Sequence, residues 1–182
     1  MGTQISTVER VRAIVFDWGD TIMRDFPEFQ GPMAHWPRVE VIPGLPEALE
    51  QIRLHFLGRL TCCVASNAGD SDAELMGLAL ARVGMRQYFH RLFTSRELGA
   101  TKPDPAFFRE VLRRLAVRPR ECIMVGNDYV KDIAPAKSVG MRTIWFSEAP
   151  VIDPMPCADA VLNSMGDLVA TVMKVGGRKQ GL

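Results

Sequence analysis

Residues 11–21, VRAIVFDWGDT, contain a mostly apolar run that stops abruptly at Asp17. A short apolar run rich in β-branched residues is typical of a buried strand in a parallel sheet. In open α/β sheets, the chemistry takes place just beyond the carboxyl ends of such strands. The segment therefore predicts a buried strand over residues 11–17, with Asp17 in the position of a nucleophile.

Strand and helix patterns alternate along the rest of the chain. The further strands are expected at residues 60–65, 91–94, 122–126, 141–146 and 159–162. The helices are expected at residues 44–57, 71–83, 105–116, 131–139 and 164–174. Such alternation indicates an α/β fold with a central parallel sheet, right-handed crossovers and helices on both faces.

Two later segments place polar residues where the chain leaves a strand or enters a helix. Ser66 and Asn67 follow the second expected strand, and by themselves are typical of a turn that starts a helix. Lys102 precedes a helix that Asp104 can cap and that has Pro105 at its first position. Two prolines, Pro103 and Pro105, fix the chain at this point. A lysine that only faces solvent would not need such a fixed position.

The fourth expected strand ends in a turn with two carboxylates, Asp128 and Asp132, four residues apart. Mg²⁺ binds through a few carboxylate oxygens and keeps several waters, so these two residues and Asp17 would converge on it. Asp132 also fits the N-cap of a helix, because Pro135 is tolerated only in a first turn. Both roles can hold at once.

Together these four segments, within residues 11–146, resemble in order the four motifs of the haloacid dehalogenase (HAD) superfamily. The resemblance implies a three-layer Rossmann-like fold and a Mg²⁺-dependent phosphohydrolase that works through an aspartyl-phosphate. It implies Asp17 as nucleophile, the Ser66 hydroxyl on the phosphoryl oxygens and Lys102 as their counter-charge. The implied catalytic residues are Asp17, Ser66 and Lys102, the substrate-binding residues Gly19, Thr21 and Asn67, and the metal ligands Asp17, Gly19 through its carbonyl, Asp128 and Asp132.

Two positions depart from the family pattern. Its phosphatases usually carry a second Asp, as general acid and base, where this chain has Gly19, and Asp20 follows one residue later. A one-residue shift along an extended segment turns a side chain to the opposite side, so we expect Asp20 to face away and stabilise the loop. His35 is then a candidate proton carrier. Asn127 replaces the first Asp of the fourth motif, so either Asn127 or Asp128 could face the metal.

The chain has no room for the cap domain that many family members insert. Only 48 residues separate Asp17 from Ser66, and 34 separate Asn67 from Lys102. We therefore expect one domain over residues 1–182. Residues 23–43, which are rich in proline and aromatic residues, are expected to form an extended flap in place of a cap. Its aromatic residues are expected to cover the sheet edge rather than stack on a ligand.

Three alternatives stay open. Phosphonatases resemble the first motif but need a lysine from a cap. Dehalogenases also lack the second Asp but need no metal, so Asp128 and Asp132 argue against them. A catalytically impaired binding protein would account for Gly19, but gives no physical reason to keep clustered charges.

Composition excludes several classes of protein. The sequence contains no apolar stretch of the roughly eighteen residues that a membrane helix needs, and its first residues lack a secretory pattern. A net charge of +1 without a long basic run gives no indication of nucleic-acid binding. Four cysteines without zinc-type spacing predict a reducing cytoplasm. The expected partner is a phosphorylated substrate, and the sequence leaves open a homo-oligomer that screens the site.

Overall fold

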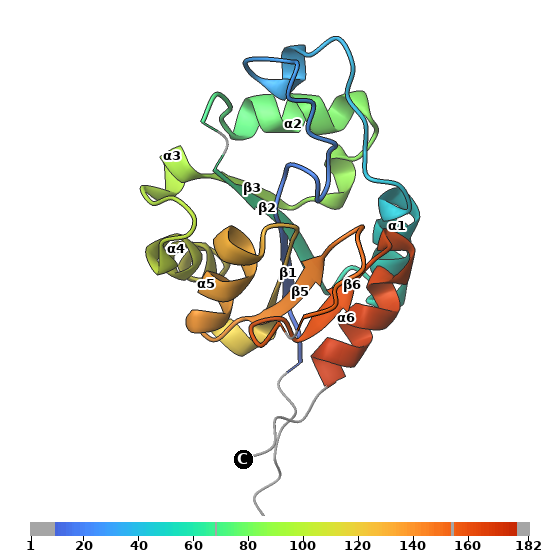
Figure 1. The fold of residues 1–182 in the computed structure, drawn as a ribbon, viewed down its shortest axis with the longest axis vertical. Coiled ribbons are helices and arrows are strands. Elements are labelled where there is room, and N and C mark those ends of the chain that lie inside the picture. Colours follow the sequence, from blue (N-terminus) through green and yellow to red (C-terminus); the bar gives the residue numbers. More distant parts are fainter. Residues whose placement is uncertain (1–9, 68, 154, 178–182) are drawn as a thin grey trace, which may run out of the picture.

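The computed structural model describes residues 10–67, 69–153 and 155–177 of the 182-residue chain. A six-stranded sheet in the order β3-β2-β1-β4-β5-β6 forms its centre (Figure 1). Every neighbouring pair of strands is parallel, which confirms the predicted α/β fold. The strands are β1 (Ala13–Phe16), β2 (Thr61–Ser66), β3 (Arg91–Thr94), β4 (Cys122–Gly126), β5 (Arg142–Phe146) and β6 (Ala160–Leu162).

Helices cover both faces of this sheet and give the molecule three layers (Figure 1). On one face α1, α2 and α6 build the larger hydrophobic cluster, and on the other α3, α4 and α5 build the smaller one. The helices are α1 (Leu45–His55), α2 (Ala73–Arg82), α3 (Ser95–Leu98), α4 (Pro105–Leu115), α5 (Ala134–Ser138) and α6 (Leu168–Gly177). All of these helices are too short or too polar to reach from one side of a membrane to the other.

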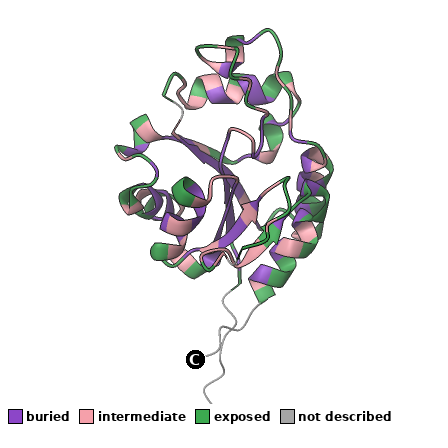
Figure 2. Cartoon of the chain, in the orientation of Figure 1, coloured by how far each residue is buried: buried purple, intermediate pink, exposed green. Residues whose placement is uncertain are grey.

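The central strand β1 explains the apolar run of the sequence. All four of its residues are buried, and Figure 2 shows burial concentrated along the strands. Successive side chains of a strand point to opposite faces: Ile14 and Phe16 belong to the larger cluster, Ala13 and Val15 to the smaller one. Each fully buried large aliphatic or aromatic side chain stabilises the fold by about 1.5–3 kcal/mol. The position of Asp17 is therefore set by a strand packed on both sides.

The helix expected at 131–139 begins differently. Residues Tyr129–Ile133 form a π-helical turn, and only Ala134–Ser138 are α-helical. Pro135 has no N–H to donate to the carbonyl of Lys131, and the N–H of Ala134 instead bonds the carbonyl of Tyr129. This wider turn carries Asp132 at the edge of the sheet.

The flap (residues 23–43) packs on α2 as part of the larger hydrophobic cluster. It includes a short 3₁₀ turn over Met33–His35. Its aromatic rings contact one another, with centroid distances of 5.7 Å between Phe26 and Phe29 and 5.6 Å between Phe29 and Trp36. The guanidinium of Arg82 on α2 donates to the carbonyls of Ala34 and Trp36, at 2.9 and 2.7 Å. These bonds fix the flap beside the carboxyl edge of the sheet.

Candidate active site

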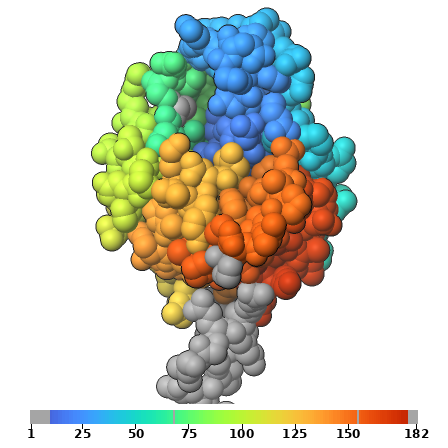
Figure 3. Space-filling view, in the orientation of Figure 1, coloured from blue at the N-terminus to red at the C-terminus, as the bar shows by residue number. Residues whose placement is uncertain are grey.

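A pocket of about 490 Å³ lies at the carboxyl edge of the sheet, where β1, β2 and β4 end. In Figure 3 the flap, in blue, faces the green residues that follow β2 across a hollow. The sequence-predicted residues that line this pocket are Asp17, Gly19, Ser66, Asn67, Lys102, Asp128 and Asp132. The flap contributes Asp25, Gly31, Met33 and Trp36, so part of its aromatic cluster also borders the pocket.

Lys102 connects two carboxylates at the bottom of this pocket. Its ammonium donates to Asp17, and to Oδ1 of Asp132 at 2.7 Å. Only 6% of Lys102 and 1% of Asp132 are exposed, so water screens these charges little. Three side chains that are far apart in the sequence thus meet in space, as the four-motif interpretation predicts. They are Asp17 after β1, Lys102 before α4 and Asp132 in the π-helical turn.

The electrostatics of this trio follow from its burial. Burial and the nearby charge of Asp17 raise the pKa of Asp132 to about 7, against the opposing effect of Lys102. Burial lowers the pKa of Lys102, but the charges of Asp17 and Asp132 outweigh it, so the pKa of Lys102 is raised. Lys102 is therefore a stable cation between two acidic groups.

Asn67 holds the backbone of Lys102. Its side-chain amide donates to the Lys102 carbonyl at 2.8 Å, and its carbonyl oxygen accepts from the Lys102 N–H at 2.8 Å. The end of β2 and the segment before α4 are tied together in this way. The sequence predicts Asn67 as a substrate-binding residue, and it carries no local signal of this clamp across 35 residues.

Thr21 and Asn127 form a second tie. The Asn127 N–H donates to the Thr21 hydroxyl at 3.1 Å, and this hydroxyl donates to Asn127 Oδ1 at 3.3 Å. The indole of Trp145 donates to the Asn127 carbonyl at 2.8 Å. Thr21 was expected among the substrate-binding residues, but it is fully buried. Thr21 contacts Asn127 and is not among the residues that line the pocket, and a substrate-binding role for it stays a prediction.

Asp128 and Asp132 have different surroundings. The Asp128 carboxylate accepts from the N–H groups of Val130 and Lys131, at 2.9 and 2.8 Å, and lies 3.3 Å from the Lys131 ammonium. Partial burial works to raise the pKa of Asp128, but the hydrogen bonds and charge of Lys131 prevail and lower it. The expectation that Asp132 is the N-cap was wrong, because Asp128 caps this turn.

Gly19 and Asp20 begin a tight loop. The backbone of Asp20 has a positive φ of 50°, and its Oδ1 accepts from the Asp25 N–H at 3.1 Å. The expected local hydrogen bond is therefore present, although Asp20 still lines the pocket. His35 is exposed on the flap and is not among the pocket residues, so the structure does not support it as a proton carrier.

The donors of this pocket fit Mg²⁺. Within the described parts of the chain, no three His, Cys, Asp or Glu side chains lie close enough to hold a metal ion on their own. Asp17 and Asp132 nevertheless turn carboxylate oxygens toward one cation, the Lys102 ammonium. Mg²⁺ commonly takes one or two carboxylates and completes its shell with water and phosphate oxygens. Both candidate carboxylates are already engaged, Asp128 by the cap bonds and Lys131, and Asp132 by Lys102 and, at 3.2 Å, by the Asp128 N–H, so both stay predicted ligands.

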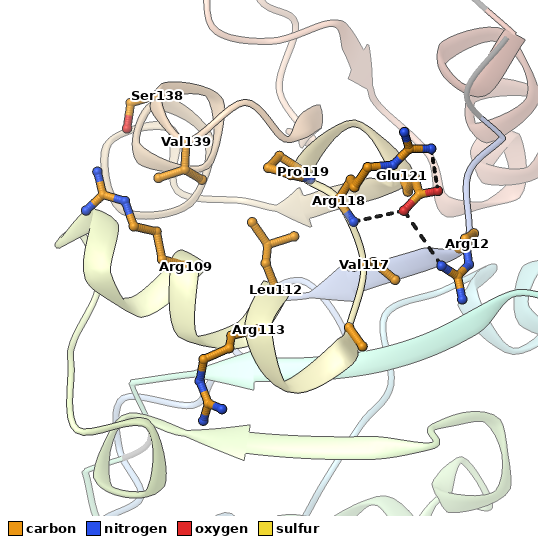
Figure 4. Close-up of a pocket in the computed structure, with 11 residues that line it drawn as sticks. Arg12, Arg109, Leu112, Arg113, Val117, Arg118, Pro119, Glu121, Ser138 and Val139 are labelled. Carbon is orange, nitrogen blue, oxygen red and sulfur yellow. Dashed lines mark hydrogen bonds and ion pairs between the residues drawn. The ribbon is translucent and has the colours of Figure 1, made fainter. Parts of the chain in front are cut away.

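A second pocket, of about 850 Å³, lies at the opposite edge of the sheet (Figure 4). Arg12 and Glu121, which directly precede β1 and β4, belong to it. Figure 4 shows Arg12 and Arg118 turned toward Glu121. The nearest nitrogen-to-oxygen distances are 3.7 Å from the Arg12 guanidinium and 3.0 Å from the Arg118 guanidinium to the Glu121 carboxylate. This pocket is larger, but all the predicted catalytic residues line the pocket at the carboxyl edge.

Several known proteins resemble this chain in sequence. The family model described as haloacid dehalogenase-like hydrolase matches residues 28–140, a range that contains Ser66, Lys102 and Asp132. The glyceraldehyde 3-phosphate phosphatase of Pyrococcus furiosus is 30% identical over 140 residues, which are 75% of this chain and 56% of that protein. The ribulose-1,5-bisphosphate 5-phosphatase of Halopiger xanaduensis is 39% identical over 126 residues, 69% of this chain and 50% of that protein. The chain thus spans about half the length of these two relatives.

Solved structures share the fold. An uncharacterized protein from Listeria monocytogenes superposes with a TM-score of 0.74 at 23% identity, over 91% of this chain and 98% of that one. A HAD phosphatase from Thermococcus onnurineus superposes with a TM-score of 0.62 at 27% identity, over 78% of this chain and 61% of that one. A HAD hydrolase from Bacillus subtilis, solved bound to magnesium, superposes with a TM-score of 0.69 at 14% identity, over 90% of this chain and 99% of that one.

Proposed function

We propose a function for this chain from one premise: it belongs to the haloacid dehalogenase-like hydrolases. The proposed activity is hydrolysis of a phosphate monoester, with Asp17 as the nucleophile that carries the phosphoryl group. One observation supports it above others, the buried bridge of Lys102 between Asp17 and Asp132 at the ends of the central strands. Two similar proteins are named as phosphatases, which favours this activity over phosphonatase or dehalogenase chemistry.

In the proposed reaction, Lys102 fixes one oxygen of Asp17, and the other carboxylate oxygen attacks phosphorus in line with the leaving group. The Ser66 hydroxyl, at the end of β2, would donate to a transferring oxygen, and Lys102 would neutralise charge that develops there. Water then cleaves the aspartyl-phosphate and returns Asp17. Mg²⁺ held by Asp17, the Gly19 carbonyl and the carboxylates of Asp128 and Asp132 would supply further charge neutralisation.

The proposal extends to the surroundings of the protein. We place it in the cytoplasm, because free thiols such as Cys63 and Cys122 in the buried strands suit a reducing compartment. Its partner would be a phosphorylated small molecule. The chain would act as one domain with the flap in place of a cap, and a homo-oligomer that screens the open pocket stays a prediction.

The experiment is a hydrolysis assay on 4-nitrophenyl phosphate and a panel of phosphorylated metabolites, with Mg²⁺ and with EDTA. We expect phosphate release with Mg²⁺ that stops in EDTA and returns when Mg²⁺ is added back. Full activity in EDTA would exclude the metal, and no release from any ester would exclude the phosphatase activity. Release of halide from a 2-haloacid without metal would indicate the dehalogenase alternative.

A further inference from the structure

Transfer of a phosphoryl group from an alkyl ester leaves an alkoxide that needs a proton. In the proposed site, Asp17, Lys102 and Asp132 are already bonded to one another at the bottom of the pocket. A proton donor must therefore come from another side chain of the pocket. The remaining carboxyl groups that line it belong to Asp20, Asp25, Asp70 and Asp128.

The position of Asp25 distinguishes it from the other three. Gly19 follows the nucleophile by two residues, and a Cβ atom placed on Gly19 would have the Asp25 side chain as its nearest neighbour. The distances from this Cβ position are 3.7 Å to Oδ2, 3.8 Å to Cβ and 3.9 Å to Cγ of Asp25. The glycine thus leaves open a space beside the nucleophile loop, and the carboxyl group of the flap residue borders it.

The loop holds Asp25 in this place. Asp20 accepts from the Asp25 N–H at 3.1 Å and donates its own N–H to the Met23 carbonyl at 2.7 Å. Next to Asp25, the guanidinium of Arg24 binds Glu148 through two hydrogen bonds, at 2.8 and 2.9 Å. The Asp25 N–H and the residue before it are therefore held in place, which positions the Asp25 side chain.

The carboxylates of Asp20 and Asp128, unlike that of Asp25, already make hydrogen bonds or ion pairs. Asp20 accepts the bond from the Asp25 N–H and lies 3.5 Å from Arg24, and Asp128 caps its turn. The Asp25 carboxylate has no hydrogen bond or ion pair to any residue in the described parts of the chain. Asp25 is exposed at the rim of the pocket, the side to which a leaving group in line with an attack from the bottom would point.

We propose that Asp25, supplied by the flap beside Gly19, is the general acid and base of this site. This inference rests on the proposed phosphatase function. As Asp17 attacks phosphorus, the P–O bond to the alcohol breaks and the Asp25 carboxyl proton passes to the leaving oxygen. The Asp25 carboxylate then takes a proton from the water that attacks the aspartyl-phosphate, which frees phosphate and Asp17. Asp20 is the positioning residue of Asp25.

The test compares leaving groups in Asp25→Asn and wild-type protein, on 4-nitrophenyl phosphate and on the best alkyl ester of the panel, both with Mg²⁺. Loss of a general acid costs about 100-fold or more in kcat where the leaving group is poor, so we expect this loss on the alkyl ester. Nitrophenolate leaves without a proton, so on the aryl ester we expect less than about a tenfold change. Asp70→Asn, which changes another carboxylate lining the same pocket, is the matched control and is expected to keep both activities.

A rescue variant makes the test sharper. Gly19 has no positive φ, and its Cβ position lies at ordinary contact distance from its neighbours, so Gly19→Asp fits there. Added to Asp25→Asn, the Gly19→Asp substitution is expected to raise kcat on the alkyl ester at least about tenfold above that of Asp25→Asn alone, because it returns a carboxyl group to the same space. Circular dichroism and the Tm check that each variant is folded.

The outcomes separate this inference from the proposed function. If wild-type protein hydrolyses neither ester, the phosphatase function itself is wrong. If it hydrolyses both and Asp25→Asn lowers neither, or lowers both equally, Asp25 is not the proton donor although the phosphatase function stands. Hydrolysis of aryl esters alone by wild-type protein would also overturn the role of Asp25.

Discussion

Lys102 is the charged residue that contacts most of the other charged groups at the bottom of this pocket. It is the shared cation of two buried carboxylates, one of which follows the central strand β1. A buried charge that loses its partner is far more costly than an exposed one. Substitutions of Lys102 and Asp17 should therefore separate catalysis from stability.

Asp17→Asn is expected to abolish turnover and to leave the fold intact. The amide has nearly the same shape, and Lys102 keeps Asp132 as a partner. Loss of a nucleophile usually costs several orders of magnitude in kcat. The measurement is phosphate release together with the circular dichroism spectrum, and retention of more than about a tenth of wild-type activity would exclude covalent catalysis by Asp17.

Lys102→Met is expected to destabilise the protein as well as inactivate it. It leaves Asp17 and Asp132 buried without their cation, and breaking such a pair costs about 3–5 kcal/mol. Urea unfolding measures the free energy. The matched control is Lys131→Met, whose exposed ion pair with Asp128 at 3.3 Å should contribute at most about 1 kcal/mol. Equal stability of the two variants would contradict the role assigned to burial.

At the scale of elements, loops that are far apart in the sequence are joined by a few hydrogen bonds. Asn67 ties the end of β2 to the segment before α4, and Arg82 of α2 holds the flap. These hydrogen bonds position the Lys102 segment and the flap, neither of which is part of a strand. Each can be removed by one substitution, with a matched control elsewhere.

Asn67→Ala should lower both stability and activity. It removes two hydrogen bonds to the backbone of Lys102, worth about 1–3 kcal/mol together, and frees the segment that carries the ammonium. Asn163→Ala is the control, because Asn163 also donates to two backbone carbonyls but in an exposed loop. Should both variants keep full kcat, the Asn67 clamp would be structural only.

Arg82→Gln should loosen the flap. The guanidinium donates to the carbonyls of Ala34 and Trp36, and a shorter side chain loses these bonds. We expect faster cleavage by chymotrypsin after Phe29, whose bond to Gln30 the protease can cut, measured by mass spectrometry under native conditions. Arg53→Gln, which removes an exposed pair with Glu50, should leave the cleavage rate unchanged.

For the molecule as a whole, the packing of the sheet keeps solvent away from most of the cysteines. Three of the four free cysteines of the protein are buried in strands, and the fourth, Cys157, is partly exposed. Burial raises the pKa of Cys62 and Cys63 to about 12 and raises that of Cys122 as well. The reactive thiolate is therefore scarce at these three positions.

Titration with a thiol-specific disulfide reagent should accordingly detect one of the four cysteines in the folded protein, Cys157. All four should react in guanidinium chloride. Rapid reaction of more than one thiol in native buffer would show that the sheet opens readily, and a peptide map would identify which strand is involved.

The elements and their polar ends could be predicted from the sequence because both are local properties. Apolar periodicity predicts the strands, and caps and prolines predict the helix that follows Lys102. Parallel strands gather their carboxyl ends at one edge, so Asp17, Ser66, Lys102 and Asp132 meet in one pocket as expected. Their catalytic roles stay predictions.

Tertiary structure alone decided how the loops arrange the remaining groups. The sequence did not predict three features of these loops: the Asn67 clamp, the burial of Thr21 against Asn127, and the cap at Asp128. Nor could the sequence bring Asp25 beside Gly19. The physical reason is that loop conformation depends on hydrogen bonds between partners as far as 124 residues apart, and on backbone angles such as the positive φ of Asp20. Local residue patterns, which reflect burial and turn chemistry, carry no information about such partners.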